Sequence, residues 1–184
     1  MMPQRHLILG GARSGKTNHA ITLAASLAAA RRLPVVYVAT AEALDDEMRD
    51  RIARHRTERP QSWQTIEAPQ ALAATLSAQP PAILLVDCLT LWLSNVLLLD
   101  FDEAQPNAAL RRWDDERSAL LSWLTEYGGA ALFVSNEVGA GIVPASALAR
   151  RFQDEQGRLN QQLAAVCESV TLVVAGIAMA IKAH

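Results

Sequence analysis

Residues 10–17 have the composition of a phosphate-binding loop. They read Gly-Gly-Ala-Arg-Ser-Gly-Lys-Thr, follow an apolar run at residues 7–9 and precede a segment rich in Ala and Leu. Gly10 and Gly15 can adopt backbone angles that other residues disfavour, so consecutive N–H groups can surround phosphate oxygens at a helix N-terminus. Lys16 would add a positive charge for the β- and γ-phosphates, and the Thr17 hydroxyl would ligate Mg²⁺. A glycine-rich turn that binds nothing is the alternative, but the order of strand, loop and helix favours a nucleoside triphosphate site.

A carboxylate at the end of a second apolar run completes the candidate phosphate site. The run Ile-Leu-Leu-Val at residues 83–86 is followed directly by Asp87. An acid at the carboxyl end of a buried strand can hold Mg²⁺ opposite the hydroxyl of the loop. Asp87 could instead cap the helix expected from Thr90, and the two roles can coexist. Given the loop, we interpret Thr17 and Asp87 as a Mg²⁺ site.

A histidine among arginines is the third chemical feature. At about 100° per residue, His55 shares one helical face with Leu44, Met48 and Ile52. In one interpretation, His55 lies at the edge of the core and the neighbouring arginines are solvated. In the other, repulsion from the arginines keeps the imidazole neutral, so that it can attack a nucleotide phosphorus while guanidinium groups bind phosphates. The residues alone leave both interpretations open for His55 and for Arg49, Arg51, Arg54, Arg56 and Arg59.

Short apolar runs alternate with helical patterns along the chain. We expect strands at residues 6–10, 34–40, 82–87, 130–136 and 171–176, with a weaker edge strand at 63–67. We expect helices at residues 16–31, 45–57, 69–77, 90–99, 107–127 and 146–168, the third of which begins at Pro69. The alternation predicts an α/β fold, a P-loop NTPase (RecA-like) three-layer sandwich with a mostly parallel central sheet, in a single domain over residues 1–184. Thr40, at the carboxyl end of the second strand, would line the ligand crevice.

Composition excludes several other classes of function. The net charge of −2 does not support binding to nucleic acid, and the absence of an uncharged apolar run of about 18 residues predicts no membrane span. Cys88 and Cys167 lack metal-type spacing and indicate reduced, buried thiols in a cytoplasmic protein. The two glycines within residues 136–141 indicate either a wide turn or a loop that approaches a ligand closely.

Three groups of motifs run nearly from end to end of the chain. The first is the loop at residues 10–17. The second comprises Val38-Ala-Thr-Ala41, Leu44-Asp-Asp-Glu-Met48, Arg51-Ile52, His55 and Arg59-Pro60. The third comprises Val134-Ser-Asn-Glu-Val-Gly-Ala-Gly-Ile-Val-Pro144, Leu148-Ala-Arg-Arg-Phe152 and Gly157-Arg-Leu-Asn160. In these motifs the chain resembles the bifunctional adenosylcobinamide kinase/adenosylcobinamide-phosphate guanylyltransferases of cobalamin biosynthesis.

The resemblance implies two reactions on one fold. The first phosphorylates the aminopropanol hydroxyl of adenosylcobinamide with ATP or GTP. The second transfers GMP from GTP onto that phosphate through a guanylylated histidine, which corresponds to His55. Arg54 stands where some members have a second histidine, and Asp87 where some have Glu. The resemblance also implies a homo-oligomer, a ring-like trimer with sites between subunits.

Specific roles follow for the remaining polar residues. Glu67 is the candidate acceptor for guanine, and Arg56 and Arg59 would meet phosphates. Asp45, Asp46 and Glu137 are candidates by position for the base of the kinase step. The expected catalytic residues are His55 and Lys16. The nucleotide is expected to contact Gly10, Gly11, Ala12, Arg13, Ser14, Gly15, Lys16, Thr17, Ala39, Thr40, Ala41, Arg56, Arg59, Glu67 and Asp87.

Two other classes of protein fit the phosphate loop alone. One is a monofunctional P-loop kinase of another small alcohol, in which His55 is structural. The other is a nucleotide-binding switch that regulates a partner. A covalent GMP adduct would distinguish the bifunctional enzyme from both.

Overall fold

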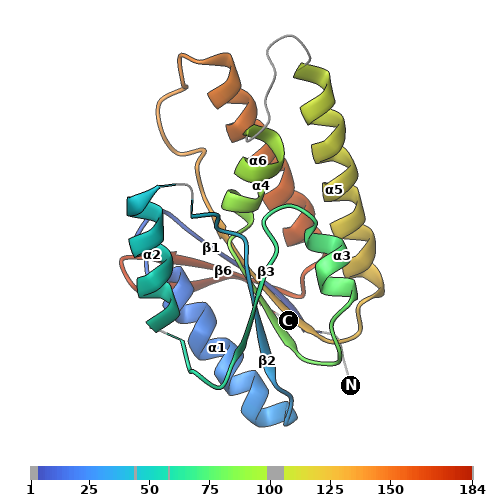
Figure 1. Ribbon diagram of the computed structural model, residues 1–184. Coiled ribbons are helices and arrows are strands. Elements are labelled where there is room, and N and C mark those ends of the chain that lie inside the picture. The colour runs from blue at the N-terminus through green and yellow to red at the C-terminus, as the bar shows by residue number, and fades with distance from the viewer. Residues whose placement is uncertain (1–3, 44, 58, 99–105, 184) are drawn as a thin grey trace.

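The computed structural model describes residues 4–43, 45–57, 59–98 and 106–183 of the 184-residue chain (Figure 1). Its strands are β1 (Gln4–Gly10), β2 (Val35–Ala39), β3 (Gln64–Glu67), β4 (Ile83–Asp87), β5 (Ala130–Asn136), β6 (Ser169–Val174) and β7 (Ile177–Lys182). Its helices are α1 (Lys16–Arg31), α2 (Asp46–Thr57), α3 (Leu72–Ser77), α4 (Leu89–Leu98), α5 (Pro106–Glu126) and α6 (Ala147–Val166).

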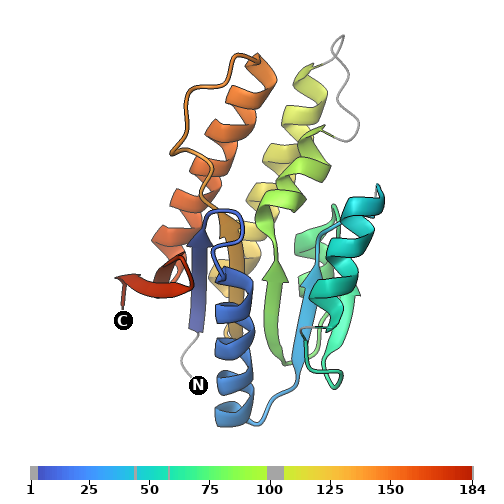
Figure 2. The same cartoon turned by 90° about the vertical axis from the view of Figure 1, so that its left-hand side faces the viewer.

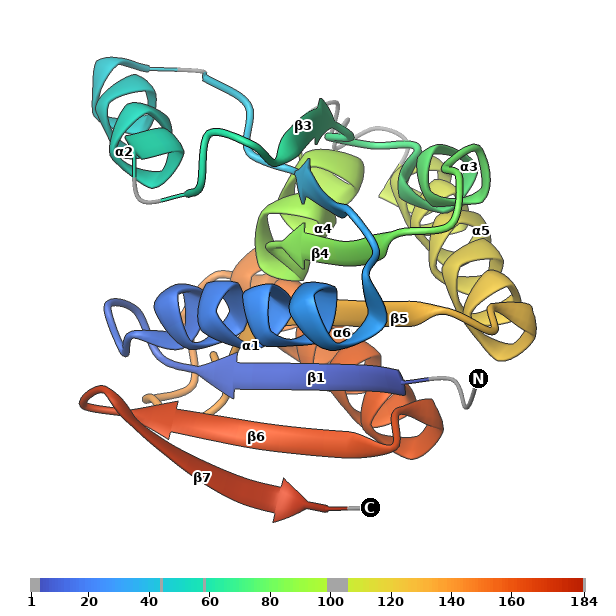
Figure 3. The ribbon, with the colours of Figure 1, turned by 90° about the horizontal axis from the view of Figure 1, so that it is seen from below.

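One mixed sheet forms the centre of the molecule. The strand order is β3-β2-β4-β5-β1-β6-β7, and every pair is parallel except β6 and β7. Figure 3 shows β7 running opposite to β6 along one edge of the sheet. Strand β5 lies between the phosphate-loop strand β1 and the Asp87 strand β4, and all three strands are parallel. The carboxyl ends of β1 and β4 therefore lie at the same edge of the sheet.

Two apolar clusters cover the two faces of this sheet. Ala20 and Ala24 of α1 pack with strand residues that include Ile8 and Leu85. On the other face, side chains of α3, α4, α5 and α6 pack with strand residues that include Leu7 and Phe133. Both faces are thus buried, which explains the continuous apolar runs of the strands. The expected three-layer arrangement and the mostly parallel sheet are confirmed.

The C-terminal strand β7 was missed by the sequence analysis. The expected strand at 171–176 ends at Val174, and the chain reverses through Ala175 (φ 52°) and Gly176 (φ 80°). Positive φ at both central residues is typical of the two-residue turns that match the twist of a hairpin. The continuous apolar run Ile177-Ala-Met-Ala-Ile181, which directly follows Gly176, is the signal that could have identified the strand.

The prediction that the third helix begins at Pro69 was wrong, because α3 begins at Leu72. The carbonyl oxygens that a helix from Pro69 would use are engaged elsewhere. The Pro69 oxygen accepts a hydrogen bond from Asn95 Nδ2 (3.0 Å), and the Gln70 oxygen accepts one from Trp92 Nε1 (2.6 Å). These bonds tie residues 69–70 to α4 in place of a first helical turn.

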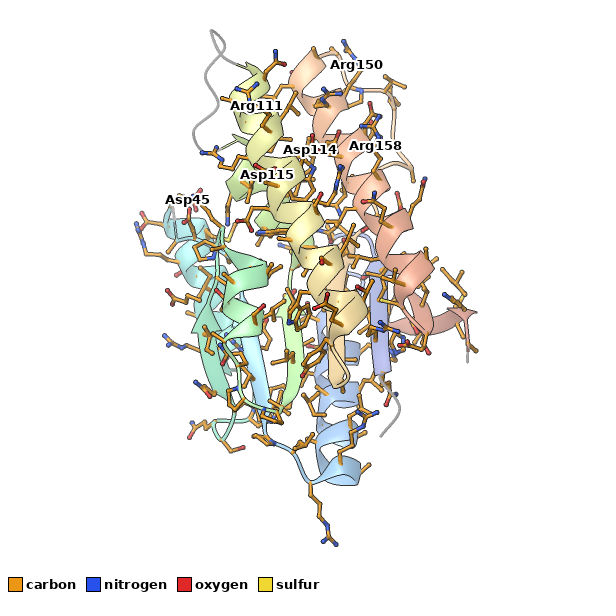
Figure 4. All side chains as sticks on the ribbon, turned by 90° about the vertical axis from the view of Figure 1, so that its right-hand side faces the viewer. Asp45, Arg111, Asp114, Asp115, Arg150 and Arg158 are labelled. Atoms are coloured by element: carbon orange, nitrogen blue, oxygen red, sulfur yellow. The ribbon has the colours of Figure 1, made fainter. Side chains whose placement is uncertain are left out.

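The N-terminal halves of α5 and α6 extend beyond the carboxyl ends of the strands (Figures 1 and 2). A buried carboxylate joins the two helices. Glu155 of α6 is 3% exposed and accepts hydrogen bonds from Trp113 Nε1 (3.1 Å), Arg117 Nη1 (2.9 Å) and Arg158 Nη1 (2.7 Å). Asp114, which also pairs with Arg117, and Arg158 mark the two sides of this contact in Figure 4.

Among the described residues, the helices include none that is both long and apolar enough to cross a membrane.

The Glu155 contact gives a stability prediction. Glu155→Ala would leave Arg117 and the Trp113 indole without their buried acceptor, so we expect the free energy of unfolding to fall by about 3–5 kcal/mol in urea titrations. Asp114→Ala is the matched control, because Asp114 pairs with the same arginine but is 58% exposed, and we expect a loss of about 1 kcal/mol or less. Equal losses from the two variants would contradict the role assigned to Glu155.

Candidate active site

The phosphate loop connects β1 to α1 and is held by close packing. Gly15 precedes α1 with φ 91°, the left-handed region that favours glycine. Gly10 is required for a different reason from the one expected, since it does not have a positive φ. A Cβ atom at Gly10 would lie 2.4 Å from Ser14 Oγ and 2.6 Å from the Val173 carbonyl oxygen. The loop therefore packs directly against β6.

The loop is also fixed by hydrogen bonds and leaves a polar atom unpaired. The Ser14 carbonyl accepts a bond from the Gly176 N–H (2.8 Å), and Lys16 Nζ donates to the Gly11 carbonyl (3.0 Å). Ser14 Oγ is buried and has no hydrogen-bond partner among the described residues. This oxygen lies beside Gly10, on the side of the loop that packs against β6.

A cavity of about 440 Å³ opens beside this loop. One wall contains Lys16 and Thr17 of α1, Asp87 at the end of β4 and Asn136 at the end of β5. The strand register explains this convergence, because Gly10 lies opposite Asn136, and Asp87 opposite Val134. The cavity is thus at the carboxyl edge of the parallel strands, where open α/β sheets bind ligands.

The opposite wall comes from the segment between β2 and β4. It contains Met48, Ile52 and Arg56 of α2, then Arg59, and Thr65 and Glu67 of β3. Figure 3 shows α2 joined to the sheet through the segments that leave β2 and enter β3. The cavity therefore has a polar wall suited to phosphate and a second wall that combines apolar side chains with two arginines.

Tyr37 of β2 contacts both walls. Its hydroxyl donates to Asp87 Oδ2 at 2.6 Å, and the Arg59 guanidinium carbon lies 3.8 Å from the centroid of its ring. Arg59 Nη1 donates in turn to Thr65 Oγ1 at 3.3 Å. Burial, reinforced by the Asp87 charge, raises the pKa of Tyr37, so the phenol stays protonated and acts as the donor.

Cys88 also lines the cavity but is not suited to nucleophilic chemistry. Burial, followed by the Asp87 charge, raises the pKa of its thiol to about 11. A thiol with this pKa is protonated at neutral pH, whereas the thiolate is the reactive form.

Comparison with known proteins identifies the family. A family model described as cobinamide kinase / cobinamide phosphate guanyltransferase matches residues 6–181. The chain belongs to this family. This membership confirms the prediction of a bifunctional kinase and guanylyltransferase, and it excludes the monofunctional kinase and the regulatory switch.

Individual relatives of the family match over nearly their full length. The chain is 52% identical over 180 residues to the bifunctional adenosylcobalamin biosynthesis protein CobP of Pseudomonas aeruginosa, covering 97% of each chain. It is 41% identical over 183 residues to the bifunctional adenosylcobalamin biosynthesis protein CobU of Escherichia coli, covering 96% of this chain and 98% of the relative. Among solved structures, the flagellar accessory protein FlaH of Methanocaldococcus jannaschii matches with a TM-score of 0.50 and 12% identity, covering 98% of this chain and 79% of that one, which supports the fold alone.

Several residues predicted from the sequence line the cavity of this family member. They are Lys16, Thr17, Ala39, Ala41, Arg56, Arg59, Glu67 and Asp87. His55 lies in the last turn of α2, but its side chain is outside the described part of the structure, as are Leu44 and the side chain of Arg54. Met48 and Ile52, expected on the same helical face as His55, both line the cavity.

Thr40 is placed differently from the expectation. It is fully buried, its hydroxyl donates to the Cys88 carbonyl (2.7 Å), and the same oxygen accepts from the Cys88 N–H (2.8 Å). The side chain therefore ties the residue after β2 to the residue after β4, and Thr40 is not among the residues that line the cavity. An isolated sequence position at a strand end could not distinguish these two directions.

The three candidate bases of the kinase step have local structural contacts. Asp45 Oδ1 accepts from the Met48 N–H (2.7 Å) and thus caps α2. Asp46 pairs with Arg49, and Glu137 Oε1 accepts from the Gly139 N–H (2.8 Å). None of the three is among the residues that line the cavity, so the described structure does not support a base role for them.

Other cavity residues were not assigned a nucleotide contact from the sequence. Tyr37 lies inside a buried strand and resembles an ordinary core aromatic, while Asn136 lay in a segment that was interpreted as either a turn or a ligand loop. Leu91 of α4 and Thr65 of β3 also line the cavity. Only the strand order could show that these residues meet.

The packing around Gly10 can be tested by adding a methyl group. We expect Gly10→Ala to lower the free energy of unfolding by about 1–3 kcal/mol, because the new Cβ must displace Ser14 or the β6 backbone. Gly11→Ala is the control in the same loop, since a Cβ there meets nothing within 4 Å, and we expect a change within about 0.5 kcal/mol. A similar loss from both variants in urea unfolding would show that the close contact is unimportant.

Proposed function

We propose that the single cavity beside the phosphate loop serves both reactions of the enzyme, within one domain over residues 1–184. The observation that supports this proposal is that two facing walls of the cavity carry different sets of functional residues. Lys16, Thr17 and Asp87 suit the handling of a triphosphate, and the facing wall includes Ile52 and Arg56 of the helix that carries His55. A nucleotide bound to the loop would thus extend toward α2.

In the kinase step, the loop amides and Lys16 would bind the β- and γ-phosphates of ATP or GTP. The aminopropanol hydroxyl of adenosylcobinamide would attack the γ-phosphorus, form the new P–O bond and release the nucleoside diphosphate, while its proton passes to solvent or phosphate. Such transfers depend mainly on alignment and on stabilisation of charge, both of which the loop can provide.

In the guanylyl step, the neutral imidazole of His55 would attack the α-phosphorus of GTP. A P–N bond forms, the bond to the β-phosphate breaks, and pyrophosphate leaves with its charge stabilised by Lys16 and the loop amides. The phosphate of adenosylcobinamide phosphate would then attack the same phosphorus and release the imidazole. The products are adenosylcobinamide-GDP and free His55.

The donor set beside the loop fits Mg²⁺. The Thr17 hydroxyl and the Asp87 carboxylate line the same cavity, and hard oxygen ligands of this kind are those that Mg²⁺ prefers. The described residues contain no group of three or more His, Cys, Asp or Glu side chains that could enclose a metal. When bound, Mg²⁺ would supply positive charge to the phosphates of the nucleotide.

Other contacts of the nucleotide follow from the same cavity. Glu67 is proposed to accept from N1 and N2 of guanine, and Arg56 and Arg59 to contact phosphates. The small side chains of Ala39 and Ala41 would allow the nucleotide to approach the end of β2 closely.

We also propose that the protein is a cytoplasmic homo-oligomer. The resemblance of its sequence to the kinase/guanylyltransferase family suggests a trimer. Ile142 is 96% exposed and Val143 71% exposed, and on the edge strand β7 Ile177 and Ile181 are 68% and 60% exposed. Exposed apolar residues and an unpaired strand edge are features that subunit contacts commonly cover. Both cysteines are free and buried, as expected in a reducing compartment.

The guanylyl step can be tested by intact mass spectrometry after incubation with GTP and Mg²⁺. We expect the wild-type protein to gain the mass of one GMP and His55→Ala to gain none while keeping kinase activity, because only the nucleophile of the guanylyl step is removed. His19→Ala is the control, since His19 lies in α1 outside the cavity lining, and it should still form the adduct. An adduct on His55→Ala would refute the assignment of the nucleophile.

A further inference from the structure

The carboxylate of Asp87 is held from the neighbouring strand. Tyr37 of β2 pairs in register with Leu85 of β4, two residues before Asp87, so the side chains of Tyr37 and Asp87 emerge from the same face of the sheet. The Tyr37 hydroxyl reaches forward and donates to Asp87 Oδ2 at 2.6 Å. A hydrogen bond from a neutral donor to a carboxylate is among the stronger side-chain interactions.

The tyrosine itself has little freedom to move. Tyr37 is 3% exposed. The guanidinium of Arg59 lies over its ring, with the guanidinium carbon 3.8 Å from the ring centroid. Arg59 is 8% exposed and bonded to Thr65 of β3. The ring is therefore fixed between the sheet and the arginine, and the position of its hydroxyl is determined by packing.

We propose that Tyr37 is a positioning residue that fixes the Asp87 carboxylate for the divalent cation of the nucleotide complex. The inference rests on the proposed role of Asp87 as a ligand. Because Tyr37 engages Oδ2, the carboxylate is restrained from rotating and Oδ1 would remain available to the metal. Partners that orient a ligating carboxylate in this way commonly alter metal affinity by about 10–100-fold when they are removed.

The same contact links the two walls of the cavity. Tyr37 meets Asp87 on the phosphate side and Arg59, two residues beyond the end of α2, on the other. The orientation of the metal ligand thus depends on a residue that also supports the segment following the proposed nucleophile helix. Tyr37→Phe separates the two contacts, because it removes the hydroxyl and keeps the ring on which Arg59 stacks.

The test measures metal binding directly, without turnover. Mn²⁺ is titrated into the full-length protein saturated with a non-hydrolysable GTP analogue, and free Mn²⁺ is followed by electron paramagnetic resonance. We expect Tyr37→Phe to weaken Mn²⁺ binding by about 10–100-fold. Tyr127→Phe is the matched control: Tyr127 is the other of the two tyrosines, and its hydroxyl donates to the Ala82 carbonyl (3.1 Å) outside the cavity lining. It should leave Mn²⁺ affinity unchanged.

Two further variants separate this inference from the proposed function. If Asp87→Asn does not weaken Mn²⁺ binding, the proposed metal role of Asp87 fails. If Asp87→Asn weakens it but Tyr37→Phe stays within twofold of wild type, only the positioning role of Tyr37 is overturned. The double variant should bind no more weakly than Asp87→Asn alone, because Tyr37 acts through Asp87. A cooperative urea-unfolding transition and unchanged binding of the analogue in EDTA verify that Tyr37→Phe keeps the fold and the nucleotide site.

Discussion

The geometry of the active site depends on how tightly the phosphate loop packs against the end of the sheet. Where β1 ends, Gly10 leaves no space for a side chain, because Ser14 Oγ and the Val173 carbonyl occupy it. The Gly176 N–H then bonds to the Ser14 carbonyl from the turn between β6 and β7. Loop residues that must point N–H groups at a phosphate are thus held on one side by β6 and its turn, and this leaves their other side available to the ligand.

The second requirement is the order of the strands. Because β5 lies between β1 and β4, the ends of three parallel strands supply the loop, Asn136 and Asp87 to one wall. The connection from β2 through α2 to β3 then returns along the far edge and brings Arg56, Arg59 and Glu67 to face them. In the proposed function, two kinds of phosphate chemistry share this fold because their residues would occupy opposite sides of one cavity.

The features that depend on local chemistry could be predicted from the sequence. The phosphate loop, the Asp87 strand end and the bounds of α1 depend on neighbouring residues and could be predicted. Features that depend on the direction of a side chain or on partners distant in the sequence could not be predicted. Thr40 turns inward to Cys88, residues 69–70 bind to α4, and Tyr37 looks like a core residue although it holds Asp87. The final strand was missed because its side chains are exposed and its turn consists of only Ala175 and Gly176.

The hydrogen bond between the Gly176 N–H and the Ser14 carbonyl joins two segments that are far apart in the sequence. The loop follows β1, the first strand of the described sequence, whereas β6 and its turn lie in the last hairpin. The shape of the phosphate loop therefore depends on a hairpin near the other end of the described sequence, so a change in that turn can alter the loop without contacting a nucleotide.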